Sequence, residues 1–497
     1  MVTWQVRIES ETTPERIFTA LRKRPVKSPG CISVEYGYNQ PVCGKRTVGW
    51  SSMIFTAKVT EGGAMVDLFA ELNWRGLVHQ TTLDDPRAWL MEKPRTLYCG
   101  FDPTADSLHV GHLMALIQLR RFQRAGHRPI ALVGGATGSI GDPSGKSAER
   151  NQLSREQIEA NVAVIRPQLE RFLDFDCGEN SAMLLDNYDW TGRISYLDFL
   201  RDVGKFFSIN VMLAKDSVRS RLSNPDSTLS YTEFSYMLLQ SYDFVHLHRT
   251  CGCELQIGGS DQWGNITAGG ELGRRMLGAQ LHGITCPLLT KADGQKMGKT
   301  EKGALWLDPA RCSPYVFYQY WINVADGDVG KPLRYFTDFT ESEVAEIESV
   351  HAADPGKREA QRQVAAALTR LVHGDAGLES AMRATQIFFG AEIGRLTDVE
   401  LAEIFAEVPG CERPRAELAG TDAAGVVGIG LIDALVMTGL CKSKGDARRR
   451  IEQGGVYLNN RRVIDFATRL TPSDLVSETT LVLRSGKKDY ALLRFPE

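Results

Sequence analysis

The sequence predicts an α/β fold in which a catalytic domain of the Rossmann type is followed by a helical domain and a small α+β domain. The first observation is a strand over Arg95 to Gly100, then a loop, a helix over Ser107 to Ala125 and a strand over Pro129 to Gly134. This order is typical of a nucleotide-binding unit whose ligands lie at the carboxyl ends of the strands. The second is a helical pattern from Pro309 to about Glu407. The third is a basic closing segment, 430–497, with 12 Lys and Arg against 8 Asp and Glu.

The composition sets limits on the function. A chain of 497 residues with 43% hydrophobic and 24% charged residues can form about three or four domains with real cores. The formal net charge of −3 means that any nucleic-acid contact must use local basic patches. The ten cysteines are scattered, and only Cys251 and Cys253 are close, so we predict no metal site. With no apolar run of roughly 18 residues, we expect a soluble cytoplasmic protein with no membrane contact.

The first 64 residues differ from the rest of the chain. They hold nine Lys and Arg against five Glu and no Asp, and they show short alternating stretches without a clear domain pattern. A strong periodic segment begins only at Met65. Our hypothesis is that 1–64 is an extension from an upstream start, either not translated in the cell or disordered, which leaves 497 − 64 = 433 residues. The alternative is a basic appendix that contacts RNA.

The remaining domain boundaries follow from changes in pattern. We predict the catalytic domain over 65–310, the helical domain over 311–410, a linker bearing proline and glycine over 411–425, and the closing domain over 426–497. Within the catalytic domain, the stretch from Asn210 to Pro225 is polar and is expected to be a surface connection.

Two short motifs suggest nucleotide chemistry. His109 and His112 are spaced to share one helix face, and Gly111 removes a side chain between them, so a nucleotide could lie flat there. Far downstream, two lysines and a hydroxyl occupy a glycine-containing loop suited to polyphosphate: Lys296, Lys299 and Thr300. Taken alone, the histidines are more often ordinary surface or metal-binding residues, and the lysines a solvated loop. The two motifs together favour the functional interpretation.

Two further cations lie in a glycine-containing segment that resembles a phosphate loop. The phosphate-loop motif needs four residues between its glycines, and Gly141 and Gly145 are separated by three, so the motif fails. We therefore expect Lys146 and Arg150 to lie on a mobile loop near the ATP phosphates.

A polar stripe indicates a small-molecule pocket. Tyr236, Gln240 and Asp243 are spaced at i, i+4 and i+7, which places them on one helix face. A packed amphipathic helix is the simpler explanation. However, Gln and Asp on a core-facing stripe are costly unless they bind something polar. A phenol ligand would supply such a partner, and a ligand without the hydroxyl would leave buried polar groups unpaired.

These motifs carry a family resemblance. The two signatures, His109 to His112 and Lys296 to Thr300, resemble those of class I aminoacyl-tRNA synthetases. Four longer runs resemble the bacterial tyrosyl-tRNA synthetases: Leu97 to Leu108, Val133 to Lys146, Tyr231 to Asp243 and Gln256 to Asn265. The resemblance covers about Met65 to Glu497. One departure is Met297-Gly298, where the wider class often has a serine, and Thr300 is expected to supply the hydroxyl.

The resemblance implies a role for each site residue. Tyr98 and Asp243 would bind the tyrosine hydroxyl. The ammonium group would contact Asp142, Tyr236 and Gln240, and the carboxylate would lie near Gln262. The residues implied to bind ATP are Cys99, Gly100, Asp102, Gly111, Gly259, Asp261, Met297 and Lys299. Those implied to act on the phosphates as catalytic groups are His109, His112, Lys146, Arg150, Lys296, Lys299 and Thr300.

The resemblance also implies the reaction and the partners. L-Tyrosine and ATP would form tyrosyl-adenylate and pyrophosphate, and the tyrosine would then pass to the 3′ end of tRNA(Tyr). Mg²⁺ would accompany ATP, with no prosthetic group. An insertion in the catalytic domain would form a homodimer, and Arg448, Arg449 and Arg450 in the tail would contact RNA phosphates. Two alternatives stay open here: a tryptophan-activating relative and a non-catalytic RNA-binding protein.

Overall fold

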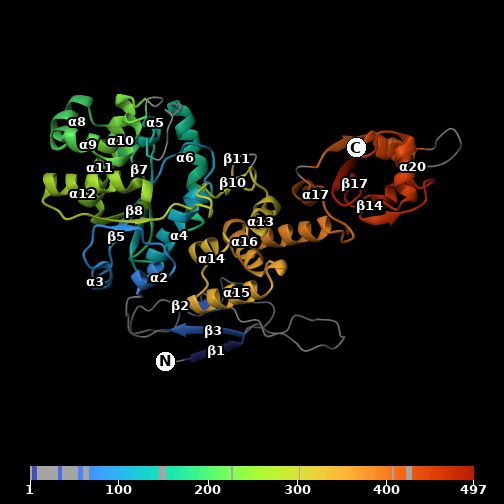
Figure 1. The fold of residues 1–497 in the computed structure, drawn as a ribbon, viewed down its shortest axis with the longest axis horizontal. Coiled ribbons are helices and arrows are strands. Elements are labelled where there is room, and N and C mark those ends of the chain that lie inside the picture. Colours follow the sequence, from blue (N-terminus) through green and yellow to red (C-terminus); the bar gives the residue numbers. More distant parts are fainter. Residues whose placement is uncertain are drawn as a thin grey trace. The chain divides into compact units, whose positions relative to one another are not determined.

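The computed structural model describes residues 67–144, 153–224, 228–300, 303–405, 408–420 and 428–496, together with three strands nearer the start (Figure 1). The chain divides into two units, Met1–Val66 and Asp67–Glu497. In the first unit, β1 (Thr3–Arg7), β3 (Ile54–Val59) and β2 (Ile32–Glu35) pair in that order as an antiparallel sheet. The alternating stretches noted in the sequence therefore form strands, and the rest of 1–66 lies outside the described residues.

The second unit begins with a six-stranded sheet in the order β4-β9-β8-β5-β6-β7. Strands β5 to β9 are parallel, and the short edge strand β4 is antiparallel to β9. The strands are β4 (Gln80–Thr81), β5 (Thr96–Phe101), β6 (Arg128–Val133), β7 (Met183–Asp186), β8 (Cys253–Gly259) and β9 (His282–Cys286). The two strands and the Rossmann-type order expected from the sequence are confirmed, with boundaries shifted by one residue.

Alternating side chains on β5 bury its two faces against different helices. Leu97, Cys99 and Phe101 join the core beneath α4 (Val110–Arg124), whereas Tyr98 packs with Phe244 of α11 (Tyr231–Cys251). Such two-sided burial is the rule for parallel sheets. The remaining helices of this domain are α2 (Leu68–Trp74), α3 (Pro86–Glu92), α5 (Thr137–Ile140), α6 (Arg155–Glu170), α7 (Tyr188–Thr191), α8 (Tyr196–Asp202), α9 (Ile209–Leu213), α10 (Asp216–Leu222) and α12 (Trp263–Leu277).

The sequence predicted a polar surface connection over Asn210 to Pro225, but the helices α9 and α10 occupy most of this stretch. The prediction is therefore wrong. Met212 and Val218 are buried with Met237 of α11. Beneath them Arg221 and Glu233 form an ion pair, with 3% and 2% of their side chains exposed. The burial of Arg221 depends on its partner Glu233, which lies 12 residues away on α11. Composition alone does not reveal this pairing and therefore suggested a polar loop.

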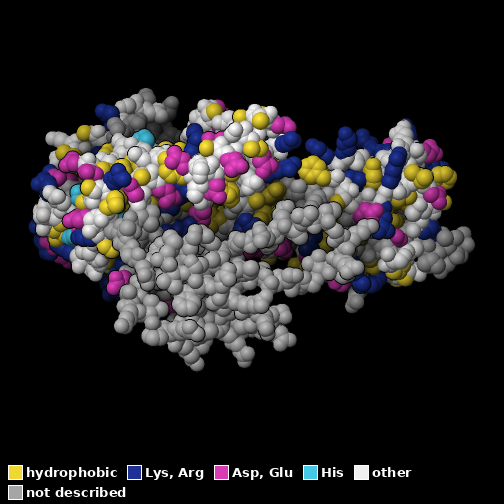
Figure 2. All heavy atoms as spheres, turned by 90° about the horizontal axis from the view of Figure 1, so that it is seen from below, with side chains coloured by type: hydrophobic (Ala, Val, Ile, Leu, Met, Phe, Trp, Pro, Cys, Tyr) yellow, Lys and Arg dark blue, Asp and Glu magenta, His cyan; other side chains and the backbone are white. Residues whose placement is uncertain are grey.

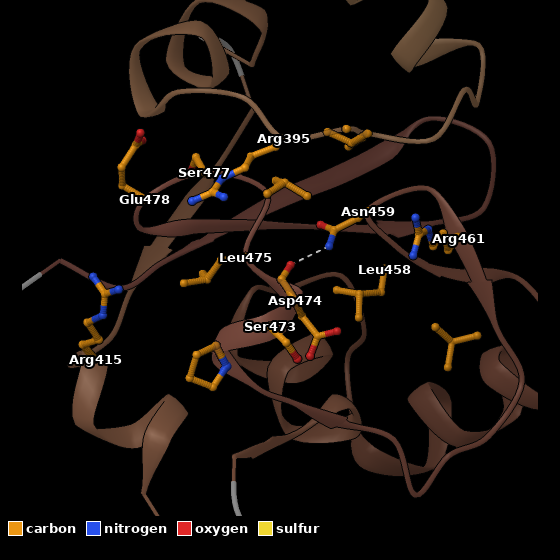
Figure 3. Close-up of a pocket in the computed structure, with 15 residues that line it drawn as sticks. Arg395, Arg415, Leu458, Asn459, Arg461, Ser473, Asp474, Leu475, Ser477 and Glu478 are labelled. Atoms are coloured by element: carbon orange, nitrogen blue, oxygen red, sulfur yellow. Dashed lines mark hydrogen bonds between the residues drawn. The ribbon is translucent and has the colours of Figure 1, made fainter.

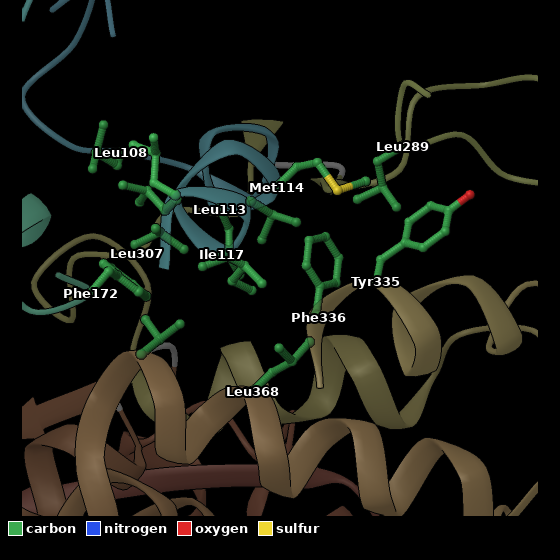
Figure 4. Packing of buried hydrophobic residues seen from close by; sticks show 14 of the residues in the cluster. Leu108, Leu113, Met114, Ile117, Phe172, Leu289, Leu307, Tyr335, Phe336 and Leu368 are labelled. Atoms are coloured by element: carbon green, nitrogen blue, oxygen red, sulfur yellow. The ribbon is translucent and has the colours of Figure 1, made fainter. Parts of the chain in front are cut away.

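The helical domain follows, as predicted, with α13 (Pro314–Ile322), α14 (Gly330–Phe336), α15 (Glu341–Ala353), α16 (Glu359–Phe388) and α17 (Asp398–Ile404). Its first helices share one hydrophobic core with the catalytic domain. Leu113, Met114 and Ile117 of α4 belong to the same buried cluster as Phe336 and Leu368 (Figure 4). Among the described residues, no helix is long and apolar enough to cross a membrane.

The C-terminal domain is a five-stranded sheet, β12-β18-β17-β14-β15, with a two-stranded sheet, β13-β16, and three helices. Its elements are β12 (Gly410–Glu412), α18 (Arg415–Ala419), β13 (Ile429–Gly430), α19 (Leu431–Met437), α20 (Lys444–Glu452), β14 (Val456–Leu458), β15 (Arg461–Val463), β16 (Arg469–Leu470), β17 (Thr480–Ser485) and β18 (Asp489–Arg494).

The linker expected over 411–425 needs correction. β12 pairs in parallel with β18, and α18 follows it, so this part of the segment belongs to the C-terminal domain. Strand β12 has only three residues, too few to show an alternating pattern. Residues 421–427 lie outside the described residues.

Candidate active site

The sequence-predicted pocket residues meet at the carboxyl edge of the parallel sheet. The chain adds β6 and β7 on one side of β5 and then returns to add β8 and β9 on the other. Ligands of such sheets bind where the strand order reverses. Tyr98, Cys99 and Gly100 lie on β5, and Gly259 ends β8 two residues before Asp261 and three before Gln262.

Asp243 is the most constrained carboxylate of this site. It is fully buried on α11, and its two oxygens accept from Asn187 Nδ2 (2.9 Å) and Trp190 Nε1 (2.8 Å). Burial raises the pKa of Asp243 to about 7, although these two hydrogen bonds lower it. The site therefore holds a carboxyl group that changes charge near neutral pH.

Tyr98 shares this buried space. Its ring packs edge-on against Phe244 at a centroid distance of 5.2 Å. Its hydroxyl is buried and has no hydrogen-bond partner among the described residues, and the same is true of Gln240 Oε1. Burial, followed by the charge of Asp243, raises the pKa of Tyr98. Buried polar atoms without partners are costly, so these two are suited to a polar ligand.

Asp102, just after β5, ties the strand ends to α11. Its Oδ2 accepts from the Tyr236 hydroxyl at 2.8 Å, and its Oδ1 accepts from Thr137 Oγ1 at 2.7 Å. A Cβ placed on Gly134 would lie 2.1 Å from the same Oδ1, so this position requires glycine. The glycine-rich segment after β6 thus approaches a site carboxylate closely.

Asp142 forms the wall of the site next to the residues that follow β8. Its Oδ2 accepts from Gln262 Nε2 at 2.7 Å, and its Oδ1 accepts from the backbone N–H of Ser144 at 2.9 Å. Asn265 Nδ2 donates to Gln262 Oε1 at 3.1 Å. Nearby, burial raises the pKa of the Asp261 carboxyl, an effect that Lys296 opposes. The structure therefore brings the loop lysine close to the acidic end of the site.

The first signature motif forms the start of α4. His109 is the N-cap of the helix, and its Nδ1 accepts from Gly111 N at 3.0 Å, while His112 Nδ1 accepts from His109 N at 3.2 Å. The two rings stack with centroids 3.9 Å apart. A Cβ on Gly111 would lie 2.7 Å from His109 Cε1, so the glycine makes room for the ring. This cap explains why the helix begins at Val110, not at Ser107.

The second signature is joined to the first by backbone pairing. His109 and Trp306 form an antiparallel bridge, and Val110 N donates to Leu305 O at 3.0 Å. Just before them, β10 (Lys299–Thr300) pairs with β11 (Gly303–Ala304). Met297 is buried and Lys296 is exposed. Lys146 and Arg150 lie outside the described residues, and only the backbone of Lys299 and Thr300 is described.

The predicted RNA-binding arginines lie on α20, but they differ in their surroundings. Arg448 and Arg449 are exposed, and Arg449 Nη2 donates to Asp446 Oδ1 at 3.2 Å. Arg450 is partly buried, its Nε lies 3.3 Å from an Asp446 oxygen, and its Nη1 donates to Ser485 Oγ at 2.7 Å. Figure 2 shows Lys and Arg side chains gathered on the right of the view, where the C-terminal domain lies.

A second basic feature of the C-terminal domain was not predicted. A hollow of about 800 Å³ is lined by Arg395, Arg415 and Arg461, which come from three separate segments (Figure 3). Asn459 and Asp474 lie on its wall, joined by a hydrogen bond from Asn459 Nδ2 to the Asp474 carbonyl at 2.6 Å. These arginines are far apart in the sequence, so no local pattern connects them.

Sequence reasoning also missed Asn187, Trp190, Thr137 and Asn265. Each donates to a predicted site residue, and in most cases the partner is distant in sequence. One signal was available, because Asn187 and Trp190 directly follow the carboxyl end of β7, the position where parallel sheets place ligand-binding groups.

Comparison with known proteins identifies the family. Residues 91–390 match the family model "tRNA synthetases class I (W and Y)", and residues 400–493 match "Tyrosine--tRNA ligase SYY-like C-terminal domain". The tyrosine–tRNA ligase of Rhodopirellula baltica is 58% identical over 88% of this chain and 99% of its own length. That of Geobacillus stearothermophilus is 50% identical over 86% of this chain and 100% of its own length.

Two solved structures of tyrosyl-tRNA synthetases are similar to about two thirds of this chain. A C-terminally truncated mitochondrial tyrosyl-tRNA synthetase of Aspergillus nidulans superposes with a TM-score of 0.57 at 30% identity, covering 65% of this chain and 94% of its own. The corresponding protein of Coccidioides posadasii gives a TM-score of 0.55 at 31% identity, covering 64% of this chain and 91% of its own.

Proposed function

The chain belongs to the tyrosine–tRNA ligases, a family of class I aminoacyl-tRNA synthetases, and from this premise we propose how its residues carry out the reaction. The enzyme couples tyrosine to tRNA with ATP as the energy source. Relatives at 47–58% identity are all tyrosine–tRNA ligases, so neither a tryptophan-activating enzyme nor a non-catalytic RNA-binding protein is favoured.

The pocket at the carboxyl edge binds tyrosine by both ends. Tyr98 and Asp243 bind the phenol hydroxyl, and Asp142, Tyr236 and Gln240 bind the ammonium group. Gln262 lies beside the carboxylate. The observation that carries this proposal is the pair of buried, unpartnered atoms, Tyr98 Oη and Gln240 Oε1, next to a carboxylate held by two donors. A ligand with polar groups at both ends provides the missing partners.

The nucleotide lies across the start of α4. Asp102 and Asp261 accept from ribose hydroxyls, and Cys99, Gly100, Gly111, Gly259 and Met297 line the adenosine. A tyrosine carboxylate oxygen attacks the α-phosphorus, the bond from this phosphorus to the β-phosphate oxygen breaks, and pyrophosphate leaves. A terminal ribose hydroxyl of tRNA then attacks the carbonyl carbon, and AMP leaves.

The protein accelerates the first step by placing charge where it develops. His109 and His112 reach the phosphates from α4, with Thr300 beside them, while Lys146, Arg150, Lys296 and Lys299 approach on loops. Mg²⁺ is proposed to arrive with ATP as part of the substrate.

The C-terminal domain contacts tRNA through exposed arginines. Arg448 and Arg449 of α20 are proposed to bind phosphates, and Arg395, Arg415 and Arg461 extend the basic surface around the hollow. Arg450 is given a structural role instead, because it is partly buried and its Nη1 donates to Ser485, a contact that Arg449 does not share. Val482 and Tyr490 share a core with Phe405 of the helical domain, so deleting the tail would also expose that domain.

A homodimer is proposed through a surface on the helices α8 to α11. Six large apolar side chains there are more than half exposed: Tyr196, Leu197, Ile209, Val211, Leu222 and Tyr231. The Tyr196 and Tyr231 hydroxyl oxygens lie 3.5 Å apart, which brings the starts of α8 and α11 together. A second copy of the chain would cover this patch. Leu197→Glu should shift the full chain to monomers in sedimentation experiments; an unchanged mass would overturn this interface.

Residues 65–497 are proposed to carry the whole activity, acting in the cytoplasm where tRNA charging serves translation. Relatives align over 425 to 441 residues, which is close to the length of 65–497. Peptide mapping of native protein that recovered fragments of 1–60 would reject the upstream-start hypothesis.

The pocket assignment is tested with an isosteric change. Tyr98→Phe removes the unpartnered hydroxyl and keeps the ring that packs on Phe244. Tyrosine affinity should fall roughly two- to tenfold, while phenylalanine affinity stays unchanged. Tyr242→Phe is the control, because Tyr242 lies on α11 but contacts Phe199 instead of the pocket. Equal effects on both amino acids would contradict the assignment.

A further inference from the structure

The loop that carries Lys296 and Lys299 is attached to the helical domain by specific polar contacts. Its backbone forms a turn in which Thr290 bridges Lys296, and Met297 N donates to Leu289 O at 2.9 Å. Three contacts join this turn to side chains on or just before the helices α13 and α14: Gly298 N donates to Tyr320 Oη (2.7 Å), Ala292 N donates to Asp328 Oδ1 (2.6 Å), and Lys331 Nζ donates to Thr290 O (2.9 Å).

Tyr320 contacts the loop at its most constrained point. Gly298 lies between the two lysines and has a φ of +85°, a conformation that favours glycine. A Cβ on Gly298 would lie 3.3 Å from Val110 Cβ, so the loop backbone packs directly on the first turn of α4. The Tyr320 hydroxyl therefore holds a segment that connects the two lysines and packs against the histidine signature.

We propose that Tyr320 is a positioning residue for tyrosine activation, which sets the placement of Lys296 and Lys299 by binding the Gly298 amide, with Asp328 and Lys331 holding the base of the loop. The inference rests on the proposed function, because the proposed function places the two lysines at the ATP phosphates. Among the described residues, the Tyr320 hydroxyl contacts Gly298 and its ring contacts Trp321, so we attribute its effect to the loop and not to tyrosine binding.

The chemistry of the contact suits this role. Burial raises the pKa of Tyr320, so the hydroxyl keeps its proton at neutral pH and accepts from Gly298 through an oxygen lone pair. Lysine ammonium groups act on developing phosphate charge only when their stems start from the right place. Because α13 belongs to the helical domain, the same contact lets that domain influence activation chemistry.

The test compares two substitutions on one helix. Tyr320→Phe removes the acceptor and keeps the ring, whereas Tyr318→Phe changes a buried tyrosine that makes no hydrogen bond to the loop among the described residues. We expect Tyr320→Phe to lower kcat for tyrosine-dependent pyrophosphate exchange roughly two- to tenfold, the effect of one net hydrogen bond, with KM for tyrosine unchanged. Tyr318→Phe should leave kcat within twofold of the unmodified enzyme.

Hydrogen exchange at the Gly298 amide gives a readout independent of turnover. Exchange should speed up in Tyr320→Phe and not in Tyr318→Phe. Asp328→Asn keeps an oxygen acceptor for Ala292 N and should retain activity, whereas Asp328→Ala should lose it in the same kcat-selective way.

Three results would overturn the inference: equal kcat in the two tyrosine variants, equal loss in kcat and tyrosine affinity, or unchanged exchange at Gly298. If the unmodified enzyme showed no tyrosine-dependent exchange, the proposed function would fail instead, and the Gly298 measurement would still decide whether Tyr320 holds the loop.

Discussion

The tyrosine pocket and the arginine-bearing surface of α20 are both polar, but they are built in opposite ways. In the pocket, Asp243 is buried and both of its oxygens have fixed donors. On α20, Arg448 and Arg449 project into solvent. A buried group recognises one ligand geometry, because each atom left unpaired costs free energy. An exposed cation recognises charge, whose effect weakens with added salt. The difference predicts that the pocket sets amino-acid choice and the surface sets tRNA affinity.

The largest expected effect comes from a group that belongs to neither region. Lys299→Ala should reduce the rate of adenylate formation roughly 100-fold or more, because the ammonium group acts on charge that develops in the transition state. Tyrosine affinity should change less than twofold. Single-turnover kinetics with equilibrium dialysis separate the two quantities, and equal losses in both would contradict a transition-state role.

Removing the central carboxylate should be the most damaging change in the pocket. Asp243→Ala leaves Asn187 Nδ2 and Trp190 Nε1 without their acceptor. We expect the free energy of unfolding to fall by about 2–4 kcal/mol, together with loss of the preference for tyrosine over phenylalanine. Chemical denaturation and amino-acid binding measure these effects. A stable variant that still prefers tyrosine would show that the recognition lies elsewhere.

The buried carboxyl group also predicts a pH dependence. The pKa of Asp243 is raised to about 7 from 3.8, so between these values the folded state holds a proton that the unfolded state has lost. Stability from this group is therefore present below about pH 4 and is lost as pH rises toward 7, by up to roughly 4 kcal/mol. Asp243→Asn should lack this loss, so its stability relative to the unmodified enzyme should increase with pH over that interval. A pH-independent difference would contradict the raised pKa.

The basic surface should respond to salt in a graded way. Replacing both Arg448 and Arg449 by Gln should raise KM for tRNA several-fold and reduce the salt dependence of binding, measured as log K against log salt, by about 1.5. Pyrophosphate exchange should be unaffected. Arg450→Gln is the contrasting variant, because its contacts with Asp446 and Ser485 predict lost stability instead. An unchanged salt slope would remove these arginines from the RNA contact.

The sequence was informative where chemistry depends on local spacing. The Rossmann-type order, the two signatures and the polar stripe of α11 all follow from neighbours a few residues apart. The donors to Asp243 could not be predicted in the same way, since Asn187 and Trp190 lie more than 50 residues away in sequence. Arg221 was missed for the same reason, and so was β12, whose partner β18 closes the chain.

Family resemblance and local spacing predicted that Arg450 contacts RNA together with Arg448 and Arg449, although its side chain faces Ser485. Equal residue types along one helix can face different surroundings, and only the packed structure distinguishes them. The same holds for Tyr320, which carries no motif and reaches Gly298 across 22 positions in the chain.

The most direct test of the central claim is amino-acid-dependent exchange of labelled pyrophosphate into ATP by the full chain, with tyrosine, phenylalanine and tryptophan compared in parallel. We predict exchange with tyrosine alone, because Tyr98 and Asp243 need a phenol hydroxyl as partner. Exchange supported by tryptophan or phenylalanine at a similar rate, or by none of the three, would contradict the account of the pocket.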